Sequence, residues 1–367
     1  MEKRILHGVK AIIPGKSDTV DIFIEDGMIK EIRKSDKETG LTAIPGFIDT
    51  HIHGFAGFGT EDARTESILN MSRNLIKYGI TSFFPTIYTD TLERMEKDII
   101  AIRDAMGKEE GAEIKGIHIE GPFISPKRIG AQNPEGQRNP DRALFKHFTS
   151  LAPGRIKAMT AAPELEGFED LLEAAEEEGV VILAGHTDAT FSDMKKAHGK
   201  GLNHATHLFN AMKGLHHREP GVVGAVFAFD DMNTEIITDG LHVHPEVVKL
   251  TLKIKGSGKV IAITDSLRPT EQTEGEALAN GVPVVIKDGL WVTKGREDLI
   301  QGSSLTMYKA FQNLLSWGID IEDAVRLTSE NAARVYALDD VGRIEVGKKA
   351  DIILLNEDNT INEVIRG

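Results

Sequence analysis

The 367-residue chain contains no cysteine. Disulfide bonds and thiolate metal sites are therefore excluded, and any metal ion would have to be held by His, Asp or Glu. The first 16 residues lack the long apolar core and the small-residue cleavage site of a signal peptide. No apolar run approaches the roughly 18–20 residues that a membrane-spanning helix requires. We therefore expect a cytoplasmic protein that does not act at a membrane.

The chain also has fewer positively charged residues than negatively charged ones. Lys and Arg number 43 against 57 Asp and Glu, which gives a formal net charge of −14. Such a surface repels a long polyanion on average, so nucleic acid is not an expected partner. A small anionic ligand is compatible with this charge, because a local group of Arg and His side chains can create a positive potential at short range although the surface as a whole is negative. The 13 histidines are unevenly placed, and all but His7 lie between positions 51 and 244.

Both ends of the chain carry β patterns. Apolar and polar residues alternate from Val20 to Ile24, ahead of an Asp26-Gly27 turn, and an apolar run follows Asp351 near the C-terminus. The chain length suits one large domain with a smaller partner. We predict that the smaller partner is a β-sandwich domain built from residues 1–44 and 338–367.

Eight short apolar runs mark candidate strands in the middle of the chain. Helical patterns lie between most of them, and one places Ile68, Met71 and Leu75 on one face and stops at Gly79. Repeated strand–helix units predict an α/β fold with parallel, buried strands, and eight of them suit a closed (β/α)8 TIM-like barrel over residues 45–337. The runs are residues 46–52, 81–84, 114–119, 156–160, 180–183, 202–206, 235–238 and 260–264.

An open doubly wound sheet is the alternative to the barrel. No Gly-x-Gly-x-x-Gly motif follows the first strand, so a dinucleotide-binding fold has no support. A β-hairpin insertion is expected near residues 280–300, after the eighth strand, with Asp288-Gly289 as its turn.

Polar side chains recur where the predicted strands end. The carboxyl ends of barrel strands meet at one face, so these residues would converge in one mouth. A set of imidazoles and carboxylates suits a divalent metal such as Zn²⁺ or Fe²⁺. The residues are His51, His53, Glu120, His186, His204, His207, Asp239, His242 and Asp265.

Each of these residues taken alone has a structural interpretation. A His-x-His pair has both side chains on one face of a strand, yet such a pair is structural more often than not. Glu120 could be a capping or ion-paired residue, His186 a hydrogen-bonded core histidine, and Asp265 the cap of the next helix. Coincidence is a poor explanation for the recurrence of such residues at several strand ends, which favours a metal site.

Longer motifs in the same region resemble the N-acetylglucosamine-6-phosphate deacetylases of the amidohydrolase superfamily. The first motif is shared across amidohydrolases, whereas the stretches His-Leu-Phe-Asn-Ala-Met and Leu-His-His-Arg-Glu-Pro-Gly are specific to the amino-sugar phosphate deacetylases. The resemblance covers nearly the whole chain, in order. The motifs are residues 45–54 (PGFIDTHIHG), 118–122 (HIEGP), 185–187 (GHT), 207–212 (HLFNAM), 215–221 (LHHREPG), 239–245 (DGLHVHP), 264–265 (TD) and 302–307 (GSSLTM).

The resemblance implies metal-dependent hydrolysis of N-acetyl-D-glucosamine 6-phosphate in amino-sugar catabolism. It makes Glu120, His186 and His207 the primary ligands of one Zn, Fe or similar divalent ion per subunit. The chain keeps His51 and His53, so the resemblance implies one or two ions per subunit, the second bridged by Glu120.

The same resemblance assigns the remaining roles. Asp265 would be the general acid and base. In this family a neighbouring subunit completes the phosphate pocket, which implies a homodimer. Substrate contacts would come from Ala131, Gln132, Asn210, Ala211, Arg218, His242, Ile300, Gln301 and Gly302.

Two positions depart from the family pattern. The loop after Glu-Gly-Pro commonly carries a His that helps to polarise the acetyl carbonyl, and Gln132 stands there in this chain. A Gln amide can donate a hydrogen bond but cannot carry positive charge. Either the metal does more of the polarisation, or the chain is slower or altered in substrate. Asp188 occupies a position where Asn is common.

Other functions are alternatives to this one. The first is deacetylation of N-acetylgalactosamine 6-phosphate, an epimer of N-acetylglucosamine 6-phosphate that differs at one hydroxyl group, and the sequence does not distinguish between the two substrates. Dihydroorotases and aminoacylases are further amidohydrolases, but dihydroorotase-like members use a carboxylated Lys as the bridge between two metal ions, where this chain has Glu120.

A metal-free scaffold protein would require that the metal-ligand residues be replaced, and none is replaced here. A sugar-phosphate binding protein would not require His51, His53 and Asp265 together.

Overall fold

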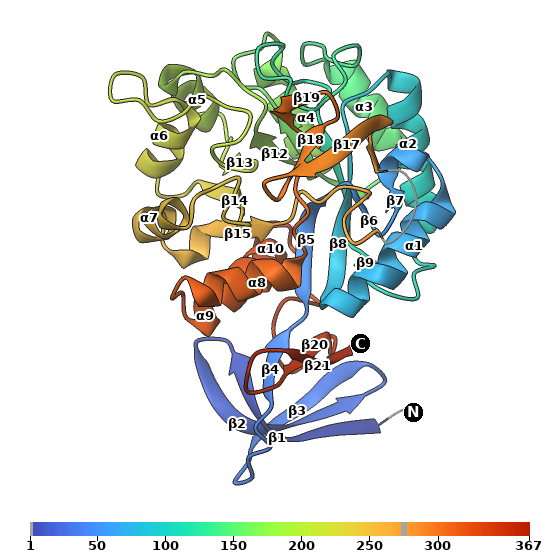
Figure 1. Cartoon of the computed structure of the whole chain (residues 1–367), viewed down its shortest axis with the longest axis vertical. Helices are drawn as coiled ribbons and strands as arrows, with labels where there is room; N and C mark the ends of the chain where they lie inside the picture. The colour runs from blue at the N-terminus through green and yellow to red at the C-terminus, as the bar shows by residue number, and fades with distance from the viewer. Residues whose placement is uncertain (1–2, 273–276) are drawn as a thin grey trace.

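The computed structural model describes residues 3–272 and 277–367. A large barrel has a small β domain at one end, and the small domain contains strands from both ends of the chain (Figure 1). Residues 1–2 and 273–276, which fall within the predicted small domain and the predicted barrel, lie outside the described residues.

Eight parallel strands form the wall of the barrel in chain order. The first and last strands meet through a parallel bridge between Ile52 and Ser266, and the Asp265 N–H donates to the His51 carbonyl at 2.8 Å. This nearly closed barrel confirms the predicted fold and excludes the open sheet. The strands are β5 (Phe47–Ile52), β8 (Ile80–Ile87), β10 (Ile117–Glu120), β11 (Ile156–Ala161), β12 (Val181–Ala184), β13 (His204–Ala205), β14 (Asn233–Ile237) and β15 (Val260–Ile263), with short β9 (Glu113–Ile114) paired to β8.

Helices surround the strands (Figure 1), and apolar side chains from helices and strands share one buried core. In α1, Ile68, Met71 and Leu75 are buried as predicted, and a further helical turn ends at Gly79, whose φ of 81° suits glycine. None of the described helices is long and apolar enough to cross a membrane. The helices are α1 (Thr65–Leu75), α2 (Leu92–Ala105), α3 (Arg142–Leu151), α4 (Phe168–Glu178), α5 (Phe191–His198), α6 (Gly221–Ala228), α7 (Pro245–Lys255), α8 (Met307–Ser316), α9 (Ile321–Val325) and α10 (Asn331–Val335), with short turns at Thr60–Asp62, Ile76–Tyr78, Ser257–Lys259 and Arg326–Glu330.

The small domain is a mixed sheet with the strand order β21-β20-β4-β1-β2-β3. Its hydrogen bonds run through one continuous sheet rather than two separate ones, and Leu6, Ile22 and Ile352 belong to a core of its own. Asp26 and Gly27 both have positive φ, as the tight turn between β2 and β3 requires. The strands are β1 (Lys3–Ile13), β2 (Lys16–Glu25), β3 (Met28–Lys34), β4 (Thr42–Pro45), β20 (Ile352–Leu355) and β21 (Ile361–Ile365).

The insertion after β15 is a four-stranded antiparallel sheet that contains the predicted hairpin. Lys287 pairs with Leu290, so Asp288 and Gly289 form the two-residue turn. The insertion lies toward the end of the barrel opposite the small domain (Figure 1). Its strands are β16 (Leu278–Ala279), β17 (Val282–Lys287), β18 (Leu290–Thr293) and β19 (Arg296–Ile300), and a separate small hairpin joins β6 (Gly54–Phe55) to β7 (Phe58–Gly59).

Candidate active site

The carboxylate of Glu120, the last residue of β10, is the centre of the candidate site. Its Oε1 lies 3.1 Å from His186 Nε2 and 3.0 Å from His207 Nε2. The same Oε1 is 3.4 Å from His51 Nε2, and Oε2 is 3.1 Å from His53 Nε2. Four imidazoles, one in β5 and the others just after β5, β12 and β13, therefore face one buried carboxylate, and the structure brings all five predicted metal ligands together.

Backbone carbonyls orient two of these imidazoles. The Nδ1 of His186 lies 2.9 Å from the Arg128 carbonyl oxygen, and the Nδ1 of His53 lies 3.0 Å from the Thr86 carbonyl oxygen. A carbonyl only accepts hydrogen bonds, so each Nδ1 carries a proton, and Nε2 is the nitrogen that has a lone pair whenever the ring is neutral. Each Nε2 faces Glu120, so a metal ion bound there would meet the Nε2 lone pairs.

The site also contains buried polar atoms that have no hydrogen-bond partner among the described residues. They include His51 Nε2, which lies 3.6 Å from Asp265 Oδ1, and His207 Nδ1. A buried polar atom without a partner costs free energy. A divalent cation between the imidazoles and the carboxylates would satisfy His51 Nε2, so the residues present fit such an ion.

Two sets of ligand atoms that include Glu120 are compact enough to hold one ion each. One set is Glu120, His186 and His207, and the other is His51, His53 and Glu120. The sets share Glu120, whose two oxygens face different imidazoles. Nitrogen and oxygen ligands without sulfur suit Zn²⁺ or Fe²⁺.

Charges within the site keep both carboxylates ionised. Burial opposes ionisation of Glu120, but the charges of His51 and His186 outweigh it and hold the pKa of Glu120 well below its usual range. Burial likewise opposes ionisation of Asp265, but the hydrogen bond with His53 and the charge of His51 lower its pKa below the ordinary value. An ionised carboxylate is what a metal ligand and a general base both require.

Asp265 follows β15 in an unusual backbone conformation, with a φ of 50°. Positive φ is uncommon outside glycine and often marks functional positions. The preceding Thr264 is fixed by Asp49 of β5, whose Oδ2 accepts a 2.6 Å hydrogen bond from the Thr264 hydroxyl. The first and last strands thus hold Asp265 beside His53, whose Nε2 is 3.4 Å from its Oδ1.

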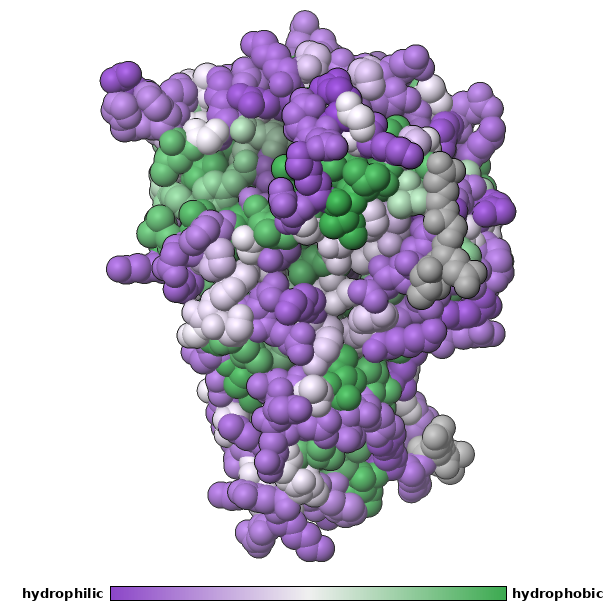
Figure 2. Space-filling model, in the orientation of Figure 1, coloured by the Kyte–Doolittle hydropathy of each residue, from purple (hydrophilic) through white to green (hydrophobic). Residues whose placement is uncertain are grey.

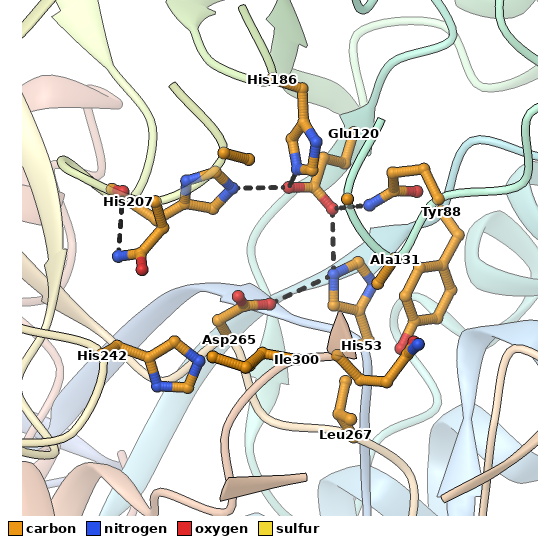
Figure 3. Close-up of a pocket in the computed structure, with 15 residues that line it drawn as sticks. His53, Tyr88, Glu120, Ala131, His186, His207, His242, Asp265, Leu267 and Ile300 are labelled. Atoms are coloured by element: carbon orange, nitrogen blue, oxygen red, sulfur yellow. Dashed lines mark hydrogen bonds and ion pairs between the residues drawn. The ribbon is translucent and has the colours of Figure 1, made fainter. Parts of the chain in front are cut away.

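A cavity of about 200 Å³ opens over these residues. Figure 3 shows the side chains of Glu120, His186, His207, His53 and Asp265 turned toward one another, with His242 and Ile300 at the edge of the group. The cavity contains most of the predicted substrate contacts. Its lining consists of His53, Tyr88, Glu120, Gly130, Ala131, Gln132, His186, His207, Asn210, Ala211, His242, Asp265, Leu267, Ile300 and Gln301.

Three predicted site residues do not line this cavity. His51 lies beneath it in β5, and Gly302 lies beside it, where an added Cβ would meet the Asp265 carbonyl oxygen. Arg218 is exposed, and its Nη1 lies 3.0 Å from His217 Nε2.

Two other polar residues of the predicted strand ends have structural roles. Asp239 holds His242 through a 2.6 Å contact between its Oδ2 and His242 Nδ1. His204 begins β13 rather than ending it, and its Nδ1 contacts Asn203 Oδ1, so its predicted place at the mouth is wrong.

Comparison with known proteins agrees with this geometry. The amidohydrolase family matches residues 42–367. The N-acetylglucosamine-6-phosphate deacetylase of Bacillus subtilis (strain 168) is 38% identical over 99% of this chain and 92% of its own length. This chain belongs to the amidohydrolase family.

Solved structures of amidohydrolases share the whole architecture. The N-acetylglucosamine-6-phosphate deacetylase of Thermotoga maritima superposes with a TM-score of 0.91 at 32% identity, over 99% of this chain and 98% of that one. A variant of the Mycobacterium smegmatis enzyme, in complex with N-acetyl-D-glucosamine-6-phosphate, gives a TM-score of 0.93 at 26% identity, over 100% of this chain and 98% of that one. Amidohydrolases are metal-dependent, and this chain has the buried His and Glu groups to bind a metal.

Gln132 is used within the site. Its Nε2 donates to Glu120 Oε2 at 2.6 Å, and its Oε1 accepts from the Thr89 N–H at 2.7 Å. Asp188, the other position that the sequence analysis singled out, accepts from Arg128 Nε at 3.1 Å. Gln132 and Asp188 are therefore both hydrogen-bonded to their neighbours.

Tyr88 is a site residue that the sequence reasoning missed. It follows β8 directly, stacks on His53 with ring centroids 3.7 Å apart, and lines the cavity. Its buried hydroxyl has no hydrogen-bond partner among the described residues. The strand-end rule that found Glu120 would also have found Tyr88, had it been applied to an aromatic side chain.

Proposed function

We propose that this chain hydrolyses the acetamide of N-acetyl-D-glucosamine 6-phosphate to glucosamine 6-phosphate and acetate, in amino-sugar catabolism. The observation that carries the proposal is the Glu120 carboxylate, which four imidazoles surround inside a cavity that Asp265 also lines. Similarity to deacetylases over nearly the whole chain supports the same substrate.

An acetamide is a poor electrophile with a poor leaving group. Its hydrolysis needs a nucleophile at neutral pH, a stabilised oxyanion and a proton for the departing amine. A bound divalent ion supplies Lewis acidity, which lowers the pKa of water and polarises the carbonyl. Asp265, whose pKa is lowered, takes the proton from the attacking water and then delivers it to the amine nitrogen, so one carboxylate serves as base and then as acid.

The metal count is part of the proposal. Glu120, His186 and His207 would hold one ion, and His51, His53 and Glu120 would hold a second where the chain takes two. Zn²⁺ and Fe²⁺ both suit this set. Gln132 is neutral and donates one of its amide N–H groups to Glu120, so it brings no positive charge to the acetyl carbonyl, and that charge would come from the bound ion.

Substrate recognition and assembly are linked in this proposal. Ala131, Asn210, Ala211, His242 and Gln301 line the cavity, and in this proposal they would contact the sugar phosphate. Arg218 lies outside its own chain's cavity, and no Lys or Arg lines that cavity among the described residues. We therefore propose a homodimer in which Arg218 serves the phosphate bound in the neighbouring subunit.

Exposed apolar side chains support this assembly. Figure 2 shows hydrophilic side chains over most of the visible face, with apolar groups at the insertion, at the side of the barrel around α6, and toward the small domain. Segments that adjoin the cavity expose Leu215, Leu241, Ile286 and Ile300 at 42–58%. Contact with a second copy would remove these side chains from water.

The test of the substrate is amine release from the purified chain with paired glucosamine and galactosamine substrates. We expect faster deacetylation of N-acetylglucosamine 6-phosphate than of its galactosamine epimer. A reversed preference would assign the chain to the epimer. No turnover of either compound by a chain that carries metal would favour the non-catalytic binding or scaffold role.

A further inference from the structure

A second buried carboxylate lies next to the site but outside the motifs. Glu235, in the middle of β14, is fully buried. Its Oε2 lies 3.5 Å from His51 Nδ1. Its Oε1 accepts hydrogen bonds from the Thr50 hydroxyl at 3.1 Å and from the Tyr336 hydroxyl at 3.4 Å. One carboxylate oxygen is thus held by two hydroxyl groups, while the other faces the imidazole of His51.

The two nitrogens of His51 face different carboxylates. Nδ1 faces Glu235, while Nε2 lies 3.4 Å from Glu120 Oε1 and 3.6 Å from Asp265 Oδ1, without a hydrogen-bond partner among the described residues. An ionised carboxylate only accepts hydrogen bonds, so a proton on Nδ1 satisfies Glu235. In that tautomer Nε2 keeps its lone pair and directs it into the site.

We propose that Glu235 is a positioning residue for the metal ligand His51. By holding the proton of His51 on Nδ1, it presents the Nε2 lone pair to the second ion, shared with His53 and Glu120. The inference rests on the proposed metal-dependent function. Glu235 does for His51 what the Arg128 and Thr86 carbonyls do for His186 and His53, but with a charged acceptor that makes Nε2 a more basic ligand.

A separate deep metal site is a weaker interpretation of the same residues. The ligand atoms of His51, His118 and Glu235 are close enough to hold one ion. Both nitrogens of His118 are already used, because Nδ1 donates to the Thr50 carbonyl oxygen at 3.0 Å and Nε2 accepts from the Thr160 hydroxyl at 2.9 Å. His118 therefore fixes the backbone next to His51 and has no lone pair left for a metal.

The test is a Zn²⁺ titration of the metal-free full-length chain and its Glu235→Gln variant. The amide keeps the shape but removes the charged acceptor of the Nδ1 proton. We expect the variant to bind the second ion about 10–100-fold more weakly, and the first ion as in the wild type. Tyr336→Phe is the matched control, because it removes a hydrogen bond to Oε1 and leaves the contact between Oε2 and His51. We expect it to keep the second ion.

Three results of this titration would overturn the inference: unchanged second-ion affinity in Glu235→Gln, an equal loss in Tyr336→Phe, or a single bound ion in the wild type. In each case the proposed function would stand if the chain still binds an ion and turns over substrate. A wild-type chain with no ion and no turnover would instead remove the proposed function.

A second measurement does not depend on folding of a Glu235 variant. Imidazole ¹⁵N NMR of the Zn²⁺-loaded wild type reports the protonation of each ring nitrogen, and the His51 signals are assigned by their loss in His51→Asn. We expect a protonated Nδ1 at His51. An Nδ1 without a proton would contradict the role of Glu235.

Discussion

At the scale of single residues, Asp265 combines a lowered pKa, a constrained backbone and a place beside His53. Asp265→Asn keeps the shape of the side chain and removes the proton acceptor. We expect kcat to fall by at least about 10²-fold, the scale of positioned acid–base catalysis. Steady-state deacetylation checks this, with circular dichroism and metal analysis of the same sample as controls for fold and metal content. Turnover close to that of the wild type would assign the proton transfer to another group.

Functional residues could be predicted from the sequence where they lie at the carboxyl end of a strand. His51, Glu120 and Asp265 were found in this way, because strand ends converge whatever the details of packing. Glu235 could not be found by this rule, since it lies inside β14 and its partner His51 is 184 positions away. Only the folded chain shows that these two side chains meet.

At the scale of elements, hydrophobic periodicity located the barrel strands and the helix with Ile68, Met71 and Leu75, because burial on one or both faces leaves a pattern in the sequence. Strand limits were less predictable. The sixth strand was expected over residues 202–206, but regular pairing covers His204–Ala205 alone. Pairing with β12 and β14, rather than the apolar run, sets these limits.

Helix α2 has an acidic side chain on its buried face. Asp98 Oδ1 has no hydrogen-bond partner among the described residues, and burial raises the pKa of this carboxyl from 3.8 to about 8. The folded pKa lies above the unfolded one. The stability contribution of the protonated carboxyl is therefore fully present below about pH 4 and is lost as the pH rises to about 8.

Asp98→Asn removes this titration, so the variant should gain stability relative to the wild type as the pH rises. We expect the unfolding free energy of the variant to rise, relative to that of the wild type, by about 4 kcal/mol between pH 5 and pH 9, because the wild type loses about 1.4 kcal/mol per pH unit up to the folded pKa of about 8. Urea denaturation at both pH values measures the shift. Asp104→Asn, at a more exposed position of the same helix, is the matched control. A difference for Asp98→Asn that stays constant with pH would mean that Asp98 is ionised throughout.

At the scale of the whole molecule, the position of Arg218 makes a prediction about assembly. If each phosphate pocket uses Arg218 of the neighbouring subunit, a heterodimer of one Asp265→Asn subunit and one Arg218→Ala subunit regains one intact site. We expect such heterodimers, isolated with two affinity tags, to be active although both homodimeric variants are impaired. Absence of recovery would place Arg218 and Asp265 of each site in the same chain.

Metal-dependent deacetylation of N-acetyl-D-glucosamine 6-phosphate can be measured on the purified chain itself. The experiment follows the release of acetate and glucosamine 6-phosphate before chelation, after exhaustive chelation, and after Zn²⁺ or Fe²⁺ is restored. We expect equal amounts of both products, loss of activity when the metal is removed, and recovery with about one or two ions per chain. Full activity in the metal-free chain, or no release of acetate by the metal-loaded chain, would show that the chain is not a metal-dependent deacetylase.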